Sequence, residues 1–368
     1  MKVSIFYELP VPRPWDELSE YRAFHEVVEQ AVLADQLGFH AIWTVEHHFL
    51  EEFSHCSNPE VLYGVIAGKT TNLRLGYGVR LAPKPYNHPV RSAESAATLD
   101  LLSGGRVDFG TGRSATRTEL EGFGIDPHQT REMWLEAVEH VVGCWTNDEH
   151  EFDGKYWQMP KRRVVPKPLQ KPHPPVFGAT GSIDGHEMMG ELGLGLCSFS
   201  IGTSMESLAE RVEKYRAGSR RCGKPLGAFQ NEHVVAFTMV NCAPTTEASC
   251  AASRGAYEWY ARASADSLSE LSDWVEGRSG DLGTYAYTDK IRTAARSGSK
   301  EVALNFDAML GKNSVVAGDP DEVVERFRQY EAAGVDQLLC LLNPHDIPHA
   351  NVMQTIDLVG RHVIPEFT

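Results

Sequence analysis

Ala41-Ile-Trp-Thr-Val-Glu-His-His-Phe49 joins a short apolar run to a carboxylate, two adjacent histidines and an aromatic ring. A short apolar run is typical of a buried strand, and the abrupt change after Val45 marks its end. We therefore expect a strand over Ala41–Val45, with the chemistry of the protein beginning where the apolar run stops.

Strand and helix patterns alternate on both sides of this run. Upstream, Lys2–Tyr7 predicts a buried strand, and apolar residues at helical spacing then lead to a stop at Gly38. Downstream, 73–81 predicts another strand. Strand patterns lie near residues 3, 41, 73, 107, 176, 195, 233 and 337. Eight strands, each followed by a helix, predict an α/β fold of the (β/α)8 TIM barrel type, with a doubly wound open sheet as the alternative.

The chain length predicts one large domain over residues 1–368, interrupted by two segments. Residues 146–175 hold a hairpin signal, Asp153-Gly154, and then a Pro-rich excursion over the surface. Residues 264–314 follow a helix predicted over 246–263 and fit no clean period. Segments of this kind are usually functional or disordered, so we expect a mobile lid before the last βα unit, or an insertion without a role.

Composition excludes several classes of protein. The formal net charge of −15 disfavours nucleic acid, because duplex binding needs basic patches. The start lacks the apolar core of a signal peptide and no later run has membrane-spanning length, so we expect a cytoplasmic protein without a membrane partner. The seven cysteines form no C-x-x-C pair, which argues against disulfides and against a structural zinc site.

The carboxyl ends of the predicted strands are the first place to look for a site, because active sites of such barrels lie there. Four of these ends carry unusual residues: Glu46-His-His-Phe49, Gly76-Tyr-Gly78-Val79, Gly110-Thr-Gly112-Arg113-Ser114 and Thr180-Gly181-Ser182-Ile-Asp184.

The two histidines after the second strand admit several roles. A histidine there can transfer a proton, hydrogen-bond an anionic intermediate or bind a metal, because its charged and neutral forms are close in free energy near pH 7. The spacing around His47 and His48 matches neither H-x-H nor H-E-x-x-H. We expect no metal, a chemical role for one histidine and a structural role for the other, with a metal hydrolase as an alternative.

Glycines and a cation mark the next two strand ends. Gly78 inside an apolar strand indicates the close approach of a backbone or a planar ligand, or else a bulge. The loop at Gly110 is a truncated G-x-G-x-x-G, but Ala115 takes the last glycine position, so a Rossmann site is weakly supported. Arg113 can hold a phosphate or the pyrimidine edge of a flavin, or pair with a neighbouring acid.

Small polar residues mark the fourth strand end. Thr180, Gly181 and Ser182 offer hydroxyl groups, bare amides and the positive end of a helix, which together suit an anion. The alternative is an ordinary turn in which Ser182 or Asp184 caps its own helix.

Taken together, these segments resemble the bacterial luciferase-like flavin monooxygenases. The resemblance rests on Glu46-His-His-Phe49, Tyr77-Gly-Val79, His88-Pro-Val-Arg91, Gly105-Arg-Val107 with Gly110-Thr-Gly-Arg113, and Val316-Ala-Gly-Asp-Pro320 through Gly334-Val-Asp336. These matches follow the family order over nearly the whole chain and place the irregular segment where the family has a mobile lid.

The resemblance implies a (β/α)8 barrel that uses reduced FMN (FMNH2) from a separate NAD(P)H:flavin reductase. It implies that O2 adds to give a C4a-(hydro)peroxyflavin, which oxidises a small organic substrate, and that the chain forms a homodimer. An F420-dependent dehydrogenase or reductase on the same barrel, and a non-catalytic flavin-binding protein, are the alternatives.

The resemblance also assigns roles to residues. His47 takes the place of the catalytic histidine, and Glu46 and Arg113 take flavin-site positions. Gly78 and Val79 match a non-prolyl cis peptide that lies against the flavin ring. Thr180, Gly181 and Ser182 fall where the family binds the flavin phosphate, which completes the predicted cofactor site.

Two departures from luciferase limit the resemblance. Gly112 stands where the luciferase α subunit has a reactive cysteine, and Gly181 where it has an acidic residue, so neither light emission nor its aldehyde substrate is implied. A peroxyflavin must be kept from collapsing to H2O2, which needs a closed pocket without water. We expect the lid and the rings of Trp43, Phe49 and Tyr77 to supply it.

Overall fold

The protein is described by a computed structural model that covers residues 1–296 and 304–367. Its centre is a barrel of parallel strands in the order β1, β2, β3, β5, β8, β9, β10, β12, and β12 pairs back onto β1. The strands are β1 (Lys2–Tyr7), β2 (Ala41–Thr44), β3 (Arg74–Tyr77), β5 (Val107–Gly112), β8 (Val176–Thr180), β9 (Gly195–Phe199), β10 (Val234–Cys242) and β12 (Gln337–Leu341). The ring of pairings is closed, which confirms the (β/α)8 prediction and excludes the open sheet.

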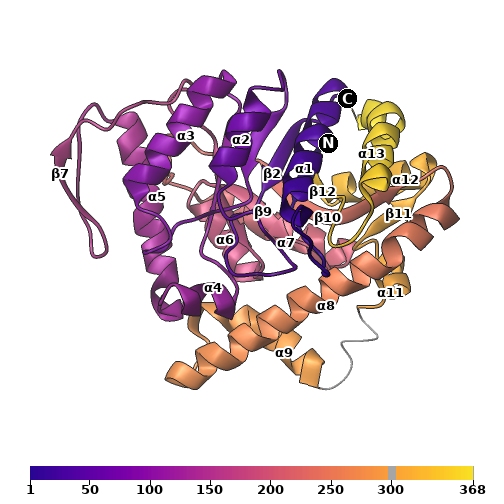
Figure 1. The fold of residues 1–368 in the computed structure, drawn as a ribbon. Coiled ribbons are helices and arrows are strands. Elements are labelled where there is room, and N and C mark those ends of the chain that lie inside the picture. The colour runs from indigo at the N-terminus through magenta and orange to yellow at the C-terminus, as the bar shows by residue number, and fades with distance from the viewer. Residues whose placement is uncertain (297–303, 368) are drawn as a thin grey trace.

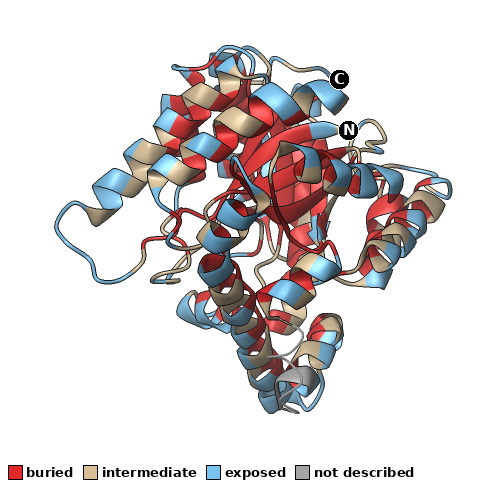
Figure 2. Ribbon diagram, turned by 90° about the vertical axis from the view of Figure 1, so that its right-hand side faces the viewer, coloured by how far each residue is buried: buried red, intermediate tan, exposed pale blue. Residues whose placement is uncertain are grey.

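Helices cover the outside of the barrel (Figure 1). The long ones are α1 (Ser19–Gln36), α2 (Pro59–Ala67), α3 (Pro89–Ser103), α5 (Thr130–Thr146), α6 (Ile183–Glu191), α7 (Met205–Ser219), α8 (Thr246–Ser279), α12 (Pro320–Ala332) and α13 (His349–Leu358). Figure 2 shows buried residues gathered along the barrel wall and the inward faces of these helices. No helix within residues 1–296 and 304–367 is both long and apolar enough to cross a membrane.

Shorter elements complete the barrel and its rim. They are β4 (Arg80–Leu81), α4 (Arg117–Gly122), η1 (Pro127–Gln129), β6 (His150–Asp153), β7 (Gln158–Arg162), η2 (Gly283–Thr288), α9 (Asp289–Arg296), α11 (Phe306–Gly311), β11 (Val316–Gly318), η3 (Val359–Val363) and η4 (Ile364–Phe367). Strands β6 and β7 pair as an antiparallel hairpin that stands away from the barrel in Figure 1.

The third strand differs from its prediction. The segment predicted as one strand over 73–81 is divided into β3 and β4 by a cis peptide bond between Gly78 and Val79. β4 pairs with β5, so the chain returns to the barrel wall after the interruption. Gly78 was predicted to mark either the close approach of a backbone or ligand, or a bulge. The structure shows that the strand is interrupted at this position.

Helix α8 also differs from its prediction, because it runs sixteen residues beyond Ala263 to Ser279. Its second half, with η2, α9 and α11, occupies most of the segment predicted to lack a pattern, and residues 297–303 of that segment lie outside the described part. Apolar periodicity fails there because α8 buries small polar residues such as Ser272 beside Leu271 and Val275. Leu271 and Val275 of this second half pack in a small separate cluster that includes Tyr285, whereas the first half of α8 packs on the main core through Tyr257 and Tyr260.

The prediction that the rings of Trp43, Phe49 and Tyr77 enclose the pocket is wrong. Trp43 and Tyr77 are buried in the main core, and Phe49 is 59% exposed against Phe123 on the outside. Trp43 enters the space left by glycines on neighbouring strands, since a Cβ atom on Gly76 would lie 2.2 Å from its ring. These rings stabilise the barrel and do not line the cavity described below.

Candidate functional site

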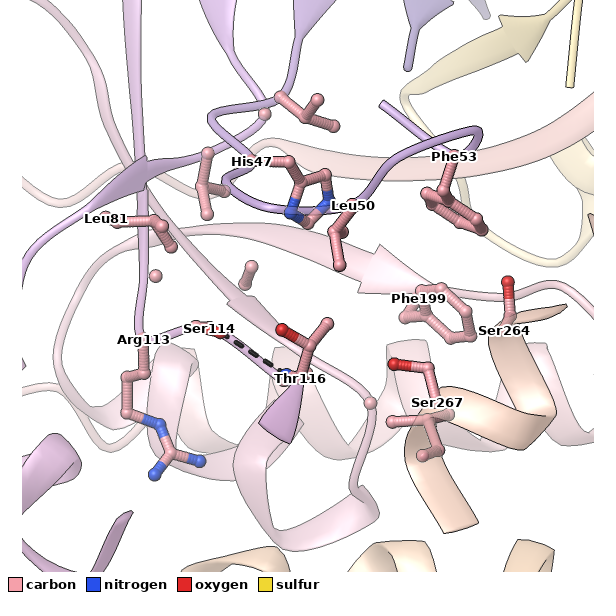
Figure 3. Close-up of a pocket in the computed structure, with 18 of the residues that line it drawn as sticks. His47, Leu50, Phe53, Leu81, Arg113, Ser114, Thr116, Phe199, Ser264 and Ser267 are labelled. Carbon is pink, nitrogen blue, oxygen red and sulfur yellow. Dashed lines mark hydrogen bonds between the residues drawn. The ribbon is translucent and has the colours of Figure 1, made fainter. Parts of the chain in front are cut away.

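A cavity of about 510 Å³ opens at the carboxyl ends of the strands. It brings together the residues predicted as site residues, and all of them line it: Glu46, His47, Gly78, Val79, Arg113, Thr180, Gly181 and Ser182. Figure 3 shows His47 and Arg113 around one space, with Ser264 and Ser267 of α8 on its far side. Four neighbouring strand ends and the long helix therefore share a single site.

His47 lies between two carboxylates. Its Nδ1 is 2.9 Å from Oε1 of Glu119, and its Nε2 is 3.6 Å from Oε2 of Glu8. Burial alone would lower the pKa of His47, but the charge and hydrogen bond of Glu119 and the charge of Glu8 outweigh it and raise the pKa to about 9. The imidazole is therefore protonated at neutral pH, with both ring nitrogens as donors.

Glu119 is the anchor of this arrangement. It is fully buried on α4, where it also accepts hydrogen bonds from the backbone N–H of His48 and from the hydroxyl groups of Ser114 and Thr116. Burial would raise its pKa, yet His47 and these donors lower it below the ordinary value of a glutamate. Glu119 remains ionised and fixes the orientation of the His47 ring.

Glu8 is the second carboxylate and is less well satisfied. It is 3% exposed, its Oε1 accepts a hydrogen bond of 2.7 Å from the hydroxyl of Tyr260, and its Oε2 has no hydrogen-bond partner among the described residues. Burial raises the pKa of Glu8, while the charge of His47 and the bond from Tyr260 oppose the rise. Because Tyr260 belongs to α8, this contact links helix α8 to the carboxylate beside the histidine.

Glu46 reaches away from His47 and holds the irregular strand. Its Oε2 accepts the backbone N–H of Leu81 at 2.9 Å, and its Oε1 accepts the side-chain amide of Asn87 at 2.8 Å. These bonds fix the chain just after the cis peptide of Gly78 and Val79. Glu46 therefore shapes the floor of the cavity through the backbone of β4.

The floor is closely packed around the cis peptide, so only small residues fit. A Cβ atom on Gly112 would lie 2.4 Å from Cγ2 of Val79, and one on Gly78 would lie 2.7 Å from the ring of Phe6. A cysteine at position 112, which luciferase has, would collide with Val79 unless the backbone moved.

Two arginines line the cavity beside the strand β8 end. Arg113 donates to the hydroxyl groups of Thr130 at 3.0 Å and Thr284 at 2.7 Å, and its guanidinium lies 4.8 Å from the centre of the Tyr285 ring. Arg131 also lines the cavity, and its buried Nε has no hydrogen-bond partner among the described residues.

The turn after β8 leads into helix α6, and Thr180, Gly181, Ser182 and Gly185 line the cavity. Ser182 is the N-cap: its Oγ accepts the backbone N–H of Gly185 at 3.0 Å and lies 3.5 Å from the hydroxyl of Thr180. Ser182 therefore caps its own helix, as the alternative for this turn predicts, and it also lines the cavity. Thr180 accepts the backbone N–H of Ser182, which shapes the turn.

The comparisons with known proteins agree with this geometry. The family model of the luciferase-like monooxygenases matches residues 1–337. The chain belongs to the luciferase-like monooxygenase family. The predicted kind of enzyme, a flavin-dependent oxidoreductase that uses O2, is thereby confirmed at the level of the family.

Relatives and solved structures cover nearly the whole barrel. The oxygenase component of flavin-dependent trigonelline monooxygenase from Acinetobacter baylyi (strain ATCC 33305 / BD413 / ADP1) is 29% identical over 340 residues, which is 92% of this chain and 88% of the relative. The oxygenating constituent of 3,6-diketocamphane monooxygenase from Pseudomonas putida, in complex with FMN, superposes with a TM-score of 0.74 at 20% identity over 99% of this chain and 98% of its own. An F420-dependent secondary alcohol dehydrogenase gives a TM-score of 0.70 at 19% identity over 100% and 99%. The two structures show the shared fold.

The sequence analysis missed residues that matter at the site. Glu8, Arg131 and Tyr260 line the cavity, and Glu119 contacts His47 without lining it. Glu8 directly follows β1, so the strand-end rule applied to the other strands would have found it. Glu119, Arg131 and Tyr260 lie on helices, and no local pattern marks them as neighbours of His47 or Arg113.

Proposed function

We propose that the protein is the oxygenase component of a two-component monooxygenase that binds FMNH2 and oxidises a small organic substrate with O2. A separate NAD(P)H:flavin reductase supplies the reduced flavin. The observation that carries the proposal is the shared cavity, which holds a protonated His47 between two carboxylates and, at another strand end, two arginines beside a helix N-terminus.

The phosphate of FMN suits the region around Arg131. The guanidinium of Arg131 and the hydroxyl groups of Thr180 and Ser182 line this region, and the dipole of α6 favours an anion near the start of the helix. Gly181 leaves room, since a Cβ atom there would have no atom nearer than 3.6 Å. The residues present therefore fit a phosphate group.

The flat ring of a flavin suits the floor at Gly78 and Val79. The cis bond, Gly112 and the backbone of Leu81 held by Glu46 give a closely packed surface without bulky side chains. When bound, reduced flavin supplies the electron pair with which O2 is activated. Arg113, fixed by two threonines and the Tyr285 ring, then offers its guanidinium to the ring edge.

His47 serves as the proton donor of the site. Its raised pKa keeps a proton on Nε2 at neutral pH, and Glu119 holds the ring through Nδ1. The geometry supports the protonated form of the histidine. This form stabilises developing negative charge on an oxygen atom, whereas a neutral histidine would take a proton from the substrate. After the proton is given up, the charge of Glu8 at 3.6 Å favours its return.

Helix α8 and η2 cover the cavity and would keep water out. Trp259, Leu268 and Tyr287 line the cavity from this segment, and Phe199 lines it from the end of β9. We propose that α8 and η2 together act as the lid. Tyr260 of α8 contacts Glu8, and Thr284 of η2 contacts Arg113. Closure would then bring both polar regions of the cavity into place together.

Anaerobic titration with reduced FMN tests the cofactor, with reduced F420 as the competing arm. We expect tighter binding of reduced FMN; preferential binding of F420 would replace this proposal with the dehydrogenase alternative. If neither binds, the site is not a flavin site.

A coupled assay tests turnover. A generic NAD(P)H:flavin reductase supplies reduced FMN, and product is scored against uncoupled H2O2. The screen includes trigonelline, the substrate in the name of the relative above, together with neutral cyclic ketones. We expect one substrate class to raise product at the expense of H2O2. Binding of FMN with H2O2 as the sole product across the screen would support the non-catalytic alternative.

A further inference from the structure

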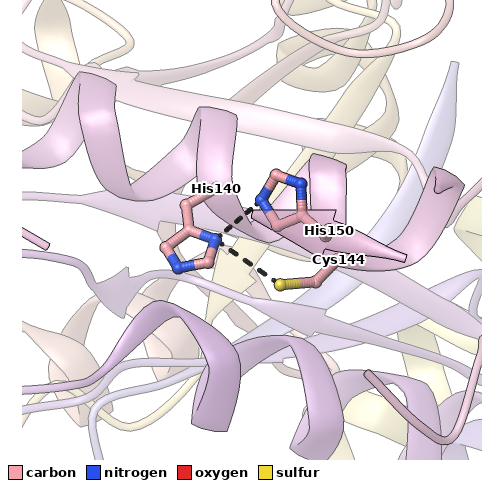
Figure 4. Close-up of side chains that lie close together, drawn as sticks. All are labelled: His140, Cys144 and His150. Carbon is pink, nitrogen blue, oxygen red and sulfur yellow. Dashed lines mark hydrogen bonds between the residues drawn. The ribbon is translucent and has the colours of Figure 1, made fainter. Parts of the chain in front are cut away.

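A second cluster of reactive side chains lies outside the cavity, between helix α5 and the hairpin of β6 and β7. His140 and Cys144 are one turn apart on α5, and His150 begins β6 (Figure 4). His140 and Cys144 are fully buried and His150 is partly exposed. None of the three lines the cavity around His47.

The three side chains converge on one point. Nδ1 of His140 lies 3.0 Å from Nε2 of His150 and 3.5 Å from Sγ of Cys144, and all three atoms lie within 4.8 Å of one another. Bonds of about 2.0–2.1 Å to nitrogen and about 2.3 Å to sulfur place tetrahedral zinc ligands roughly 3.3–3.6 Å apart. The two separations from Nδ1 of His140 are close to this geometry before any ion is added, and the third, between His150 and Cys144, is at most 4.8 Å.

Hydrogen bonding alone satisfies the cluster poorly. A ring nitrogen carries either one proton or one lone pair, yet Nδ1 of His140 faces both His150 and Cys144. A single cation accepts electron pairs from all three atoms at once.

We propose that His140, Cys144 and His150 bind one divalent transition-metal ion of zinc-like preference, which clamps the hairpin onto α5. Two imidazoles and a thiolate are a donor set that zinc favours over magnesium or calcium. Three protein ligands leave a fourth position for water, reached from the side of the partly exposed His150.

The surroundings are shaped for this contact. Gly143 lacks a side chain where His150 packs, because a Cβ atom there would lie 2.3 Å from Cε1 of that ring. Phe152 stacks on His140 with ring centres 4.5 Å apart and planes 7° from parallel. The amide of Asn147 lies 3.4 Å from Nδ1 of His150, and its oxygen, turned to this position, accepts the proton that binding through Nε2 leaves there.

The hairpin gains most from such a clamp. Every residue of β6 and β7 is partly or fully exposed, and an isolated two-stranded hairpin is marginally stable in water. Binding replaces the thiol proton of Cys144 with the metal, so one proton is released and no electron is transferred.

Metal binding is tested on the full-length, untagged protein after removal of metal with a chelator. Titration with Co²⁺ is expected to give one equivalent of bound metal with a thiolate-to-cobalt charge-transfer band in the near ultraviolet. Zn²⁺ should displace the cobalt and release one proton per chain. Cys144→Ser should lose the charge-transfer band and His150→Gln should weaken binding at least tenfold, whereas Cys250→Ser, a cysteine outside the cluster, should bind as wild type.

A stability measurement separates the clamp from a folding defect in a variant. Zinc at 100 times its dissociation constant should shift the unfolding equilibrium of the wild type about 100-fold toward the folded state. Cys144→Ser and His150→Gln should fold without metal and show no such shift. Absence of a stoichiometric cobalt band in the wild type, or equal stabilisation of wild type and both variants by zinc, would overturn the proposal.

Discussion

His47 lines the cavity and His186 lies behind one of its walls, and their pKa values move in opposite directions. His47 follows β2 between Glu8 and Glu119, which raise its pKa to about 9 against the effect of desolvation. His186 lies one turn into α6, where burial lowers its pKa to about 4 and its ring nitrogens lie within hydrogen-bond distance of the carbonyl of Ser182 and the hydroxyl of Ser198. Neighbouring charge, and not burial, decides which histidine is a cation.

This difference divides the cavity by chemistry. The side formed by β1, β2 and α4 holds a proton between carboxylates, which suits proton transfer. The side formed by β8 and α6 keeps its histidine neutral and carries Arg131 and the hydroxyl groups of Thr180 and Ser182, where we propose that an anion binds. The predictions below test whether the two sides act separately.

The largest effect is expected from His47→Asn. The asparagine keeps a polar side chain but cannot hold the proton, so coupled product formation should fall about 10²- to 10⁴-fold, the usual contribution of a general acid. Affinity for reduced FMN should stay within a few-fold, because the anion is bound on the other side. Single-turnover product yield and anaerobic titration measure the two quantities.

His48→Asn is the matched control, since His48 does not line the cavity and stacks on Tyr86. It should retain product formation to within a few-fold. An equal loss in His48→Asn and His47→Asn would mean that the loop, and not the proton, had been disturbed.

A smaller effect is expected on the anion side from Arg131→Met. Loss of charge-assisted donors to the phosphate should weaken binding of reduced FMN about 10- to 100-fold. Reduced riboflavin lacks the phosphate, so its affinity should change little. Fluorescence titration of both flavins distinguishes phosphate recognition from general damage, because damage would weaken both to the same extent.

The sequence predicted the site residues at strand ends better than the residues that contact them. Glu46, His47, Gly78, Arg113 and Ser182 were found because each follows a strand within a few residues, and barrels place such residues on one face. Their partners belong to distant segments: Glu119 is 72 residues from His47, and Tyr260 is 252 residues from Glu8. Only closure of the barrel and the path of α8 join them.

The same limit explains the misplaced aromatic rings. The sequence shows that Trp43 and Tyr77 lie on strands, but the side to which a ring points depends on glycines of neighbouring strands, such as Gly76 and Gly110. A two-residue period cannot be read in strands of four residues that are buried throughout. The length of α8 was missed for the related reason that its buried face is small and partly polar.

The contrast between the histidines predicts opposite pH dependence of stability. The pKa of His47 is raised from 6.5 to about 9 on folding. Its contribution to the free energy of unfolding is therefore complete below pH 6.5 and is lost as pH rises to about 9. The pKa of His186 falls from 6.5 to about 4, so the contribution of a neutral His186 to the free energy of unfolding is present above pH 6.5 and is lost as pH falls to about 4. Each difference amounts to roughly 3 kcal/mol.

Urea unfolding of wild type, His47→Asn and His186→Asn across pH 4 to 9 measures this contrast. The free-energy difference between wild type and His47→Asn should shrink above pH 6.5, and that between wild type and His186→Asn should shrink below it. Parallel pH curves for both variants would remove the distinction between the two sides of the cavity.

The finest test separates the two carboxylates around His47. Glu119 touches Nδ1 at 2.9 Å with a hydrogen bond, whereas Glu8 stands 3.6 Å from Nε2 without one. Glu119→Gln should therefore lower the pKa of His47 by about one unit or more, and Glu8→Gln by less, because a charge-assisted hydrogen bond adds to the Coulomb attraction. NMR titration of the His47 ring gives both shifts, and the alkaline limb of kcat/KM should follow them. A larger shift in Glu8→Gln would make the carboxylate linked to the lid helix through Tyr260 the one that holds the proton, and proton delivery would then depend on the position of α8.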